Sequence, residues 1–147
     1  MKQQTIKDTL SQGGGIQEAD YRLYLIRDGE TVFYVGQSRN PHNRFLSHLG
    51  MDGRSSPSEI GRFIRKNAPT SDAWLFEQYT LEEVGDHSSV TTAERALIAR
   101  YRPCFNTTAN PDRLPLPAQY KDIHSDENKY GEQLVRRFGI KRKAGKR

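Results

Sequence analysis

The chain has 147 residues, of which 34% are hydrophobic, with a mean hydropathy of −0.86 and a net charge of +5. This length suits one ordinary domain, and the low hydrophobic content predicts solvated tails. The chain has no apolar run of membrane-spanning length and no signal-peptide pattern, and its single cysteine, Cys104, excludes an internal disulfide and a cysteine-based zinc site. We therefore expect a cytoplasmic protein with no membrane partner.

The first part of the chain predicts a flexible arm followed by a β-hairpin. Residues 1–19 contain three consecutive glycines and little hydrophobic pattern, so we expect a flexible N-terminal arm. Residues 21–27 alternate with the two-residue period of a strand, and Asp28-Gly29 is a turn signal. Residues 31–35 are rich in strand-forming side chains, which completes the predicted hairpin.

Two helices are expected next. Asn40 as N-cap and Pro41 at the first helical position predict the start of one helix, and Gly50 marks its end. Its apolar face is formed by Phe45, Leu46 and Leu49. A capping box from Ser56 to Glu59 predicts the start of the other helix. Its inward side chains are Ile60, Phe63 and Ile64, and its outward cations are Arg62, Arg65 and Lys66.

One more strand and one more helix follow. Residues 73–80 predict a third strand with Trp74 and Phe76 on one face. A capping box from Thr91 to Glu94 predicts a helix that runs to about Tyr101. Its buried stripe is expected to be Ala93, Ala96, Leu97 and Tyr101. These elements predict a mixed α/β fold for residues 20–110, with helices flanking a small three-stranded, antiparallel-containing sheet.

Residues 111–147 are predicted to contain a connector with three prolines, a helix from Tyr120 to Arg137 and a basic tail. Seven cations in the last twelve residues leave residues 1–135 with 16 Lys and Arg against 18 Asp and Glu, a net charge of −2. A basic tail suggests a polyanionic partner, and a solubilising tail fits the composition equally well. The seven cations are Arg136, Arg137, Lys141, Arg142, Lys143, Lys146 and Arg147.

Three candidate residues lie on the predicted helices. Arg44 and His48 are four residues apart, so they share a helix face on which a cation and an imidazole could bind a phosphate and move a proton. The ordinary alternative is a solvated polar face. Glu94 could close the capping box with Thr91, or its carboxylate could hold a divalent metal.

Two candidate tyrosines, Tyr24 and Tyr34, lie on the two strands of the predicted hairpin. A three-residue loop between Arg27 and Thr31 would place them directly opposite each other on one face of the sheet. A two-residue loop would put them on opposite faces. Ordinary packing would also account for tyrosines on strands.

These residues occur in an order that resembles the signature of the GIY-YIG nuclease family. Arg22-Leu23-Tyr24 resembles the first motif, with Arg22 in place of its glycine, and Tyr34-Val35-Gly36 closely resembles the second. Glu94 resembles the family's metal-binding glutamate at the start of a helix. Residues 103–106 resemble its closing Pro-x-x-Asn. The resemblance extends from about Tyr21 to Asn106.

The resemblance implies a DNA endonuclease with a defined set of site residues. One residue, Tyr24, would bind or deprotonate the attacking water with help from hydrogen bonds to other site residues. Arg44 would contact the scissile phosphate, and Glu94 would hold one Mg²⁺ or Mn²⁺. Asn106 would orient the site or its backbone, its alternative being a turn residue. The full set is Tyr24, Tyr34, Arg44, His48, Glu94 and Asn106. Three histidines match no family position and are expected at the surface: His42, His87 and His124.

The expected partner is DNA, bound by a monomer or by a DNA-induced dimer. The expected DNA-binding residues are Arg44, Arg62, Arg65, Lys66, Arg136, Arg137, Lys141, Arg142 and Lys143. A nuclease domain of this size suits a role in restriction, in defence or in mobile DNA. Two alternatives remain: a non-catalytic nucleic-acid-binding module, and a nuclease subunit of a larger repair or recombination complex.

Overall fold

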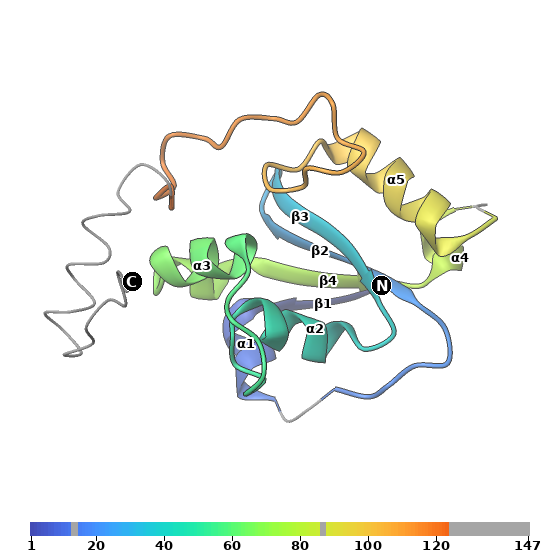
Figure 1. Ribbon diagram of the computed structural model, residues 1–147, viewed down its shortest axis with the longest axis horizontal. Helices are drawn as coiled ribbons and strands as arrows, with labels where there is room; N and C mark the ends of the chain where they lie inside the picture. Colours follow the sequence, from blue (N-terminus) through green and yellow to red (C-terminus); the bar gives the residue numbers. More distant parts are fainter. Residues whose placement is uncertain (13–14, 86–87, 124–147) are drawn as a thin grey trace, which may run out of the picture.

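The computed structural model describes residues 1–12, 15–85 and 88–123, and it places helices on both faces of one antiparallel sheet (Figure 1). The strand order is β1-β4-β2-β3. The mixed α and β class is therefore confirmed. Three strands were expected, and the described residues form a sheet of four. In chain order the elements are β1 (Lys2–Thr5), α1 (Ile6–Ser11), β2 (Arg22–Asp28), β3 (Thr31–Ser38), α2 (Pro41–His48), α3 (Glu59–Lys66), the 3-10 helix η1 (Thr70–Ala73), β4 (Leu75–Tyr79), α4 (Leu81–Val84) and α5 (Val90–Tyr101).

The prediction of a flexible arm is wrong for the start of the chain, because β1 is the additional strand and α1 packs beneath it. The β1 strand is entirely polar, so it lacks the hydrophobic alternation by which strands are recognised. It is held by backbone pairing with β4 and by a 2.6 Å hydrogen bond that Gln3 Nε2 donates to the buried carboxylate of Glu77. Ile6 and Thr9 then bury one side of α1.

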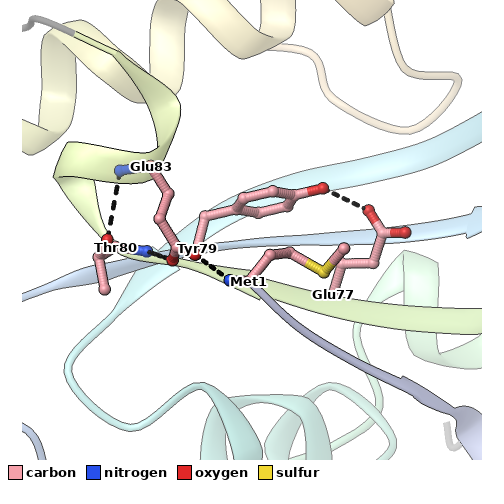
Figure 2. Close-up of polar contacts among 5 residues, drawn as sticks. All are labelled: Met1, Glu77, Tyr79, Thr80 and Glu83. Carbon is pink, nitrogen blue, oxygen red and sulfur yellow. Dashed lines mark hydrogen bonds and ion pairs between the residues drawn. The ribbon is translucent and has the colours of Figure 1, made fainter.

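A second anchor lies at the first residue. The N-terminal ammonium of Met1 forms an ion pair with Glu83 at the start of α4 (Figure 2). Glu83 also closes a capping box with Thr80, and Tyr79 donates a 2.8 Å hydrogen bond to Glu77. The bonds of Met1 and Gln3 join residues that are more than seventy positions apart, so they leave no local signal in the sequence.

The hairpin of β2 and β3 is confirmed, although its geometry differs from the prediction. Asp28 pairs with Thr31 across a two-residue loop, and a β-bulge follows where Phe33 has no partner between the pairs of Val32 and Tyr34. Since a bulge adds one residue to one strand, it restores the face that the shorter loop would have reversed. The two tyrosines therefore share a face, but as diagonal neighbours: Tyr24 pairs with Gly36, not with Tyr34.

The sheet buries hydrophobic side chains on both faces, which gives the domain two cores. The face covered by α1, α2 and α3 is rich in aromatic rings. The face covered by α5 is aliphatic. The first core includes Ile6, Tyr24, Ile26, Phe33, Phe45, Leu49, Ile60, Phe63, Ile64, Trp74, Phe76 and Ile123. The second consists of Leu23, Leu25, Val32, Val35, Ala93, Leu97 and Ile98.

Two of the predicted helix starts are corrected. Helix α2 begins as predicted, with the Asn40 side chain as its cap. Helix α3 is capped by Ser58 instead of Ser56, because the Ser58 hydroxyl accepts the hydrogen bond of Gly61 N–H. Helix α5 is capped by Ser89, which accepts from Thr92 N–H, so the predicted capping box at Thr91 does not form.

The segment after α5 has no regular element, yet it packs on the sheet. Cys104 N–H and Phe105 N–H donate to the carbonyls of Val32 and Phe33, which covers the open edge of β3. Further along, Tyr120 packs edge-on against the aromatic rings of the first core, so the predicted connector is part of the packed domain.

The predicted last helix does not begin at Tyr120, since residues 120–123 are not helical. The rest of that helix and the basic tail lie outside the described residues. Within the described part of the chain, every helix is too short or too polar to cross a bilayer.

The packing of α1 predicts that Ile6→Ala destabilises the fold. Ile6 is 1% exposed, and removing a buried aliphatic side chain of this size costs about 2–5 kcal/mol. The neighbouring Lys7 is exposed on the same helix, so Lys7→Ala is the matched control. Urea unfolding of both variants measures the difference. Equal stabilities would show that the N-terminal segment contributes nothing to the core.

Candidate active site

An open cavity of about 650 Å³ lies where the edge of β3 meets α2, α5 and the segment after α5. Five of the six predicted site residues line it: Tyr34, Arg44, His48, Glu94 and Asn106. The sixth, Tyr24, is buried behind this lining, with its ring centroid 6.1 Å from the rings of both Tyr34 and His48. Residues from opposite faces of the sheet thus meet at one sheet edge.

Tyr24 is held in place by a close approach to the neighbouring strand. Its cross-strand partner is Gly36, where a Cβ atom would lie 2.4 Å from the Tyr24 hydroxyl and from its Cζ atom. Only glycine leaves room for the ring. Burial, and then the nearby Tyr34, raise the pKa of Tyr24 far above its usual range, and Arg44 only partly offsets this. The Tyr24 phenol is therefore protonated at neutral pH.

His48 links the Tyr24 phenol to helix α3. Its Nε2 lies 2.8 Å from the Tyr24 hydroxyl, and its Nδ1 lies 2.8 Å from the hydroxyl of Ser58, the α3 cap. The imidazole is 3% exposed. Burial and the positive charge of Arg44 lower the pKa of His48 to about 4. His48 is consequently neutral near pH 7 and has an unprotonated ring nitrogen.

Tyr34 and Arg44 line the cavity and are both more exposed than His48. The half-buried ring of Tyr34 packs edge-on against His48, with centroids 5.2 Å apart. Burial raises the pKa of Tyr34, and the charge of Arg44 opposes that increase. Arg44 is exposed, and the positive charge of its guanidinium acts to lower the pKa of both phenols and of the imidazole. This position leaves it able to bind an anion that enters the cavity.

Glu94 reaches the cavity from α5, on the other side of β3. Its carboxylate accepts a 3.2 Å hydrogen bond from Gln37 Nε2 on β3, while Ser89 caps the helix. The capping role that the sequence allowed for Glu94 is therefore excluded. A carboxylate beside open space suits Mg²⁺, which takes one or two carboxylates and completes its shell with water and substrate oxygens, and a second carboxylate, Glu59, also lines the cavity. Among the described residues, no group of three or more His, Cys, Asp or Glu side chains is arranged to bind a metal ion.

Asn106 fixes the backbone of β3 beneath the cavity. Its Oδ1 accepts from Val35 N–H and its Nδ2 donates to the Val35 carbonyl, both at 2.9 Å. The side chain thereby replaces a neighbouring strand at the residue between Tyr34 and Gly36. This is the orienting role expected for Asn106, and it goes beyond that of a turn residue.

Sequence reasoning missed three residues of the site. Ser58 falls inside a predicted capping box that gives it no special part, and Gln37 lies beyond residues 31–35, the run of strand formers that predicts the second strand. Arg95 lines the cavity one residue after Glu94. Ser58 and Gln37 contact predicted site residues only through tertiary packing, so no spacing in the sequence reveals them.

Three further predicted nucleic-acid contacts, all on α3, do not line the cavity: Arg62, Arg65 and Lys66. Arg62 and Arg65 are exposed on α3, but Arg65 also donates to the Leu49 carbonyl. Lys66 donates a 2.7 Å bond to the Asp122 carbonyl, which ties the C-terminal segment to α3. The five predicted contacts in the tail lie outside the described residues.

The expectation of a surface position is wrong for His42, which is 6% exposed in the first turn of α2. The other two histidines assigned to the surface, His87 and His124, lie outside the described residues.

Comparisons with protein-family models, with curated proteins and with solved structures found no significant match to this chain. Its function is therefore inferred from the residues and the geometry of the cavity.

The two bonds of Asn106 predict that Asn106→Ala destabilises the domain by about 2 kcal/mol or more, because it leaves two buried backbone groups of Val35 unpaired. The exposed neighbour Thr107 provides the control variant Thr107→Ala. Thermal or urea unfolding measures the effect. A loss no larger than that of the control would mean that β3 is held by other contacts.

Proposed function

We propose that the protein is an endonuclease of the GIY-YIG type that hydrolyses phosphodiester bonds in DNA with the help of one divalent cation. The observation that carries this proposal is the 2.8 Å contact between Tyr24 and His48 beside a cavity that also presents Arg44 and Glu94. A neutral base, a cation and a carboxylate at one place are the groups that this hydrolysis needs.

The arrangement is better explained by catalysis than by packing. Burial of a tyrosine and a histidine that satisfy each other would suffice for a core. It would not require an exposed arginine on α2 and a carboxylate on α5 to face the same open cavity. The order of these residues along the chain also resembles the nuclease signature, which supports the same interpretation.

The proposed proton path begins at the cavity wall. Tyr34, which lines the cavity, holds the attacking water. As the water oxygen bonds to phosphorus, the bond from phosphorus to the leaving oxygen breaks, and that oxygen takes a proton from solvent. The proton of the attacking water passes to the Tyr24 hydroxyl, and the Tyr24 proton passes to Nε2 of His48. The Tyr24 phenol is never fully ionised in this path, which agrees with its raised pKa. His48 can accept this proton because its lowered pKa leaves the imidazole neutral at the start of the reaction.

The two charged residues would act on the phosphate. The Arg44 guanidinium would bind the scissile phosphate and stabilise the charge that accumulates on its oxygens in the transition state. Glu94 would hold the cation, and a Mg²⁺ or Mn²⁺ ion bound there would supply charge stabilisation for the leaving oxygen. The distribution of roles differs from the sequence-based expectation in one respect: the water contacts Tyr34 first, because Tyr24 is 1% exposed.

Plasmid nicking tests this proposal. We expect Mg²⁺-dependent nicking that stops when EDTA removes the metal, and a fall of about a hundredfold or more in the single-turnover rate of Tyr24→Phe and of Tyr34→Phe. Glu94→Ala should lose metal-dependent cleavage while its unfolding transition remains cooperative. DNA affinity should change much less than the rate, since neither hydroxyl carries a charge for the phosphates.

Matched controls exist for both kinds of variant. Tyr21 is half exposed and Glu82 is exposed on α4, so Tyr21→Phe and Glu82→Ala should cleave at the wild-type rate. Full activity in Glu94→Ala would contradict the proposed metal site. If the wild-type protein binds DNA but nicks none of several substrates with Mg²⁺ or Mn²⁺, a non-catalytic binding module is the correct description.

The basic tail predicts a salt-dependent contribution to DNA binding. Residues 1–135 carry a net charge of −2, so deletion of residues 136–147 should weaken binding at moderate salt and reduce the slope of log affinity against log salt. Each phosphate that the tail neutralises should add roughly 0.9 to that slope. Cut positions should not move, because phosphate contacts carry no sequence information.

The control for the truncation is its stability. If Arg136, Arg137 and Phe138 instead end a helix packed on the core, the deletion lowers the melting temperature, so thermal unfolding of the truncated protein separates the two explanations. A stable truncated protein with the wild-type salt slope would show that the tail does not contact DNA.

A further inference from the structure

Ser58 is the residue where the cap of α3 meets the proposed proton path. Its hydroxyl oxygen lies 2.8 Å from His48 Nδ1, 3.3 Å from Gly61 N and 3.5 Å from the His48 carbonyl oxygen. Nothing in its sequence context separates it from an ordinary helix cap. The direction of each of these hydrogen bonds decides what Nε2 of His48 can do.

A serine hydroxyl has one proton to donate and two lone pairs that accept. Gly61 N–H occupies one lone pair, since a backbone amide can only donate. If the hydroxyl proton points to the His48 carbonyl, the second lone pair accepts from Nδ1–H, and all three partners are satisfied. If the proton points to Nδ1, the His48 carbonyl still accepts from Ser58 N–H, 2.9 Å away, but the ring proton must then lie on Nε2, and the buried Tyr24 hydroxyl loses Nε2 as the acceptor for its proton.

The tautomer of His48 follows from these hydrogen bonds. In a neutral imidazole one ring nitrogen carries the proton and the other accepts. With the proton on Nδ1, Nε2 has a free lone pair directed at the Tyr24 hydroxyl, 2.8 Å away. With the proton on Nε2, His48 would donate to Tyr24 and could not accept its proton.

We propose that Ser58 is a positioning residue, which holds His48 in the tautomer with its proton on Nδ1 so that Nε2 accepts from Tyr24. The hydroxyl oxygen of Ser58 therefore both caps α3 and orients the proposed base. The tautomer assignment stands on the hydrogen bonds alone. Its consequence for the reaction rate rests on the proposed function.

Nitrogen NMR of the full-length protein with labelled histidine tests the assignment at pH 7.5, where His48 is neutral. The chain has four histidines, so the His48 signals are identified by their disappearance in His48→Gln. We expect the protonated nitrogen of His48 to be Nδ1 in the wild type. Protonated Nε2 in the wild type would overturn the proposal.

Three variants separate the hydroxyl from the cap. Glycine is tolerated at an N-cap nearly as well as serine, while alanine is not, so Ser58→Gly removes the hydroxyl with the smaller effect on α3. We expect Ser58→Gly and Ser58→Ala to shift His48 toward the other tautomer, and Ser58→Thr to retain the wild-type form. An unchanged tautomer in Ser58→Gly would overturn the proposal.

Single-turnover cleavage by the same variants tests the consequence for catalysis. We expect the rate constant of Ser58→Gly to fall by about tenfold or more with DNA affinity unchanged, and Ser58→Thr to restore it. A shifted tautomer with an unchanged rate would refute the positioning role. If the wild type cleaves no DNA, the proposed function fails, and the NMR result still decides the tautomer assignment.

Discussion

The hydrogen bond between the buried hydroxyl of Tyr24 and Nε2 of His48 is the interaction on which the candidate site depends. It joins the central strand β2 to helix α2, and both partners are almost fully removed from water. A buried polar pair is costly unless each group is satisfied, which makes the pairing specific. Gly36 provides the space that the Tyr24 ring occupies, and Ser58 satisfies the other imidazole nitrogen. Removing either hydrogen bond of His48 would leave a polar atom buried without a partner.

The position of the cavity follows from the way the β3 edge of the sheet is covered. Strand β3 is terminal in the sheet, and residues 104–106 cover it with backbone and side-chain hydrogen bonds. An edge covered in this way is protected from pairing with another chain. It is also a boundary that side chains from both faces can reach. For this reason Glu94 from α5 and Arg44 from α2 face the same cavity, although the sheet separates their helices.

The sequence predicts those features that have local causes. The hairpin, the start of α2 at Asn40 and the burial of Phe63 on α3 follow from turn, capping and periodicity signals. Strand β1 could not be predicted, because its polar Gln3 is held by Glu77, and the preceding Met1 by Glu83, from distant parts of the chain. The site shows the same division. The two tyrosines reach one face by a bulge at Phe33, which the uniform run of strand formers does not mark. Ser58 could be identified only once α2 and α3 were in contact.

The most direct test of the proposed hydrolysis is the origin of the new oxygen in the cleaved DNA. A duplex oligonucleotide would be cut in a single turnover in water labelled with heavy oxygen, and the products weighed by mass spectrometry. We predict one labelled oxygen on the terminal phosphate, because water attacks while Tyr24 and His48 take up its proton. An unlabelled phosphate, a phosphate attached to a tyrosine of the protein, or intact DNA in the presence of Mg²⁺ and Mn²⁺ would contradict this mechanism.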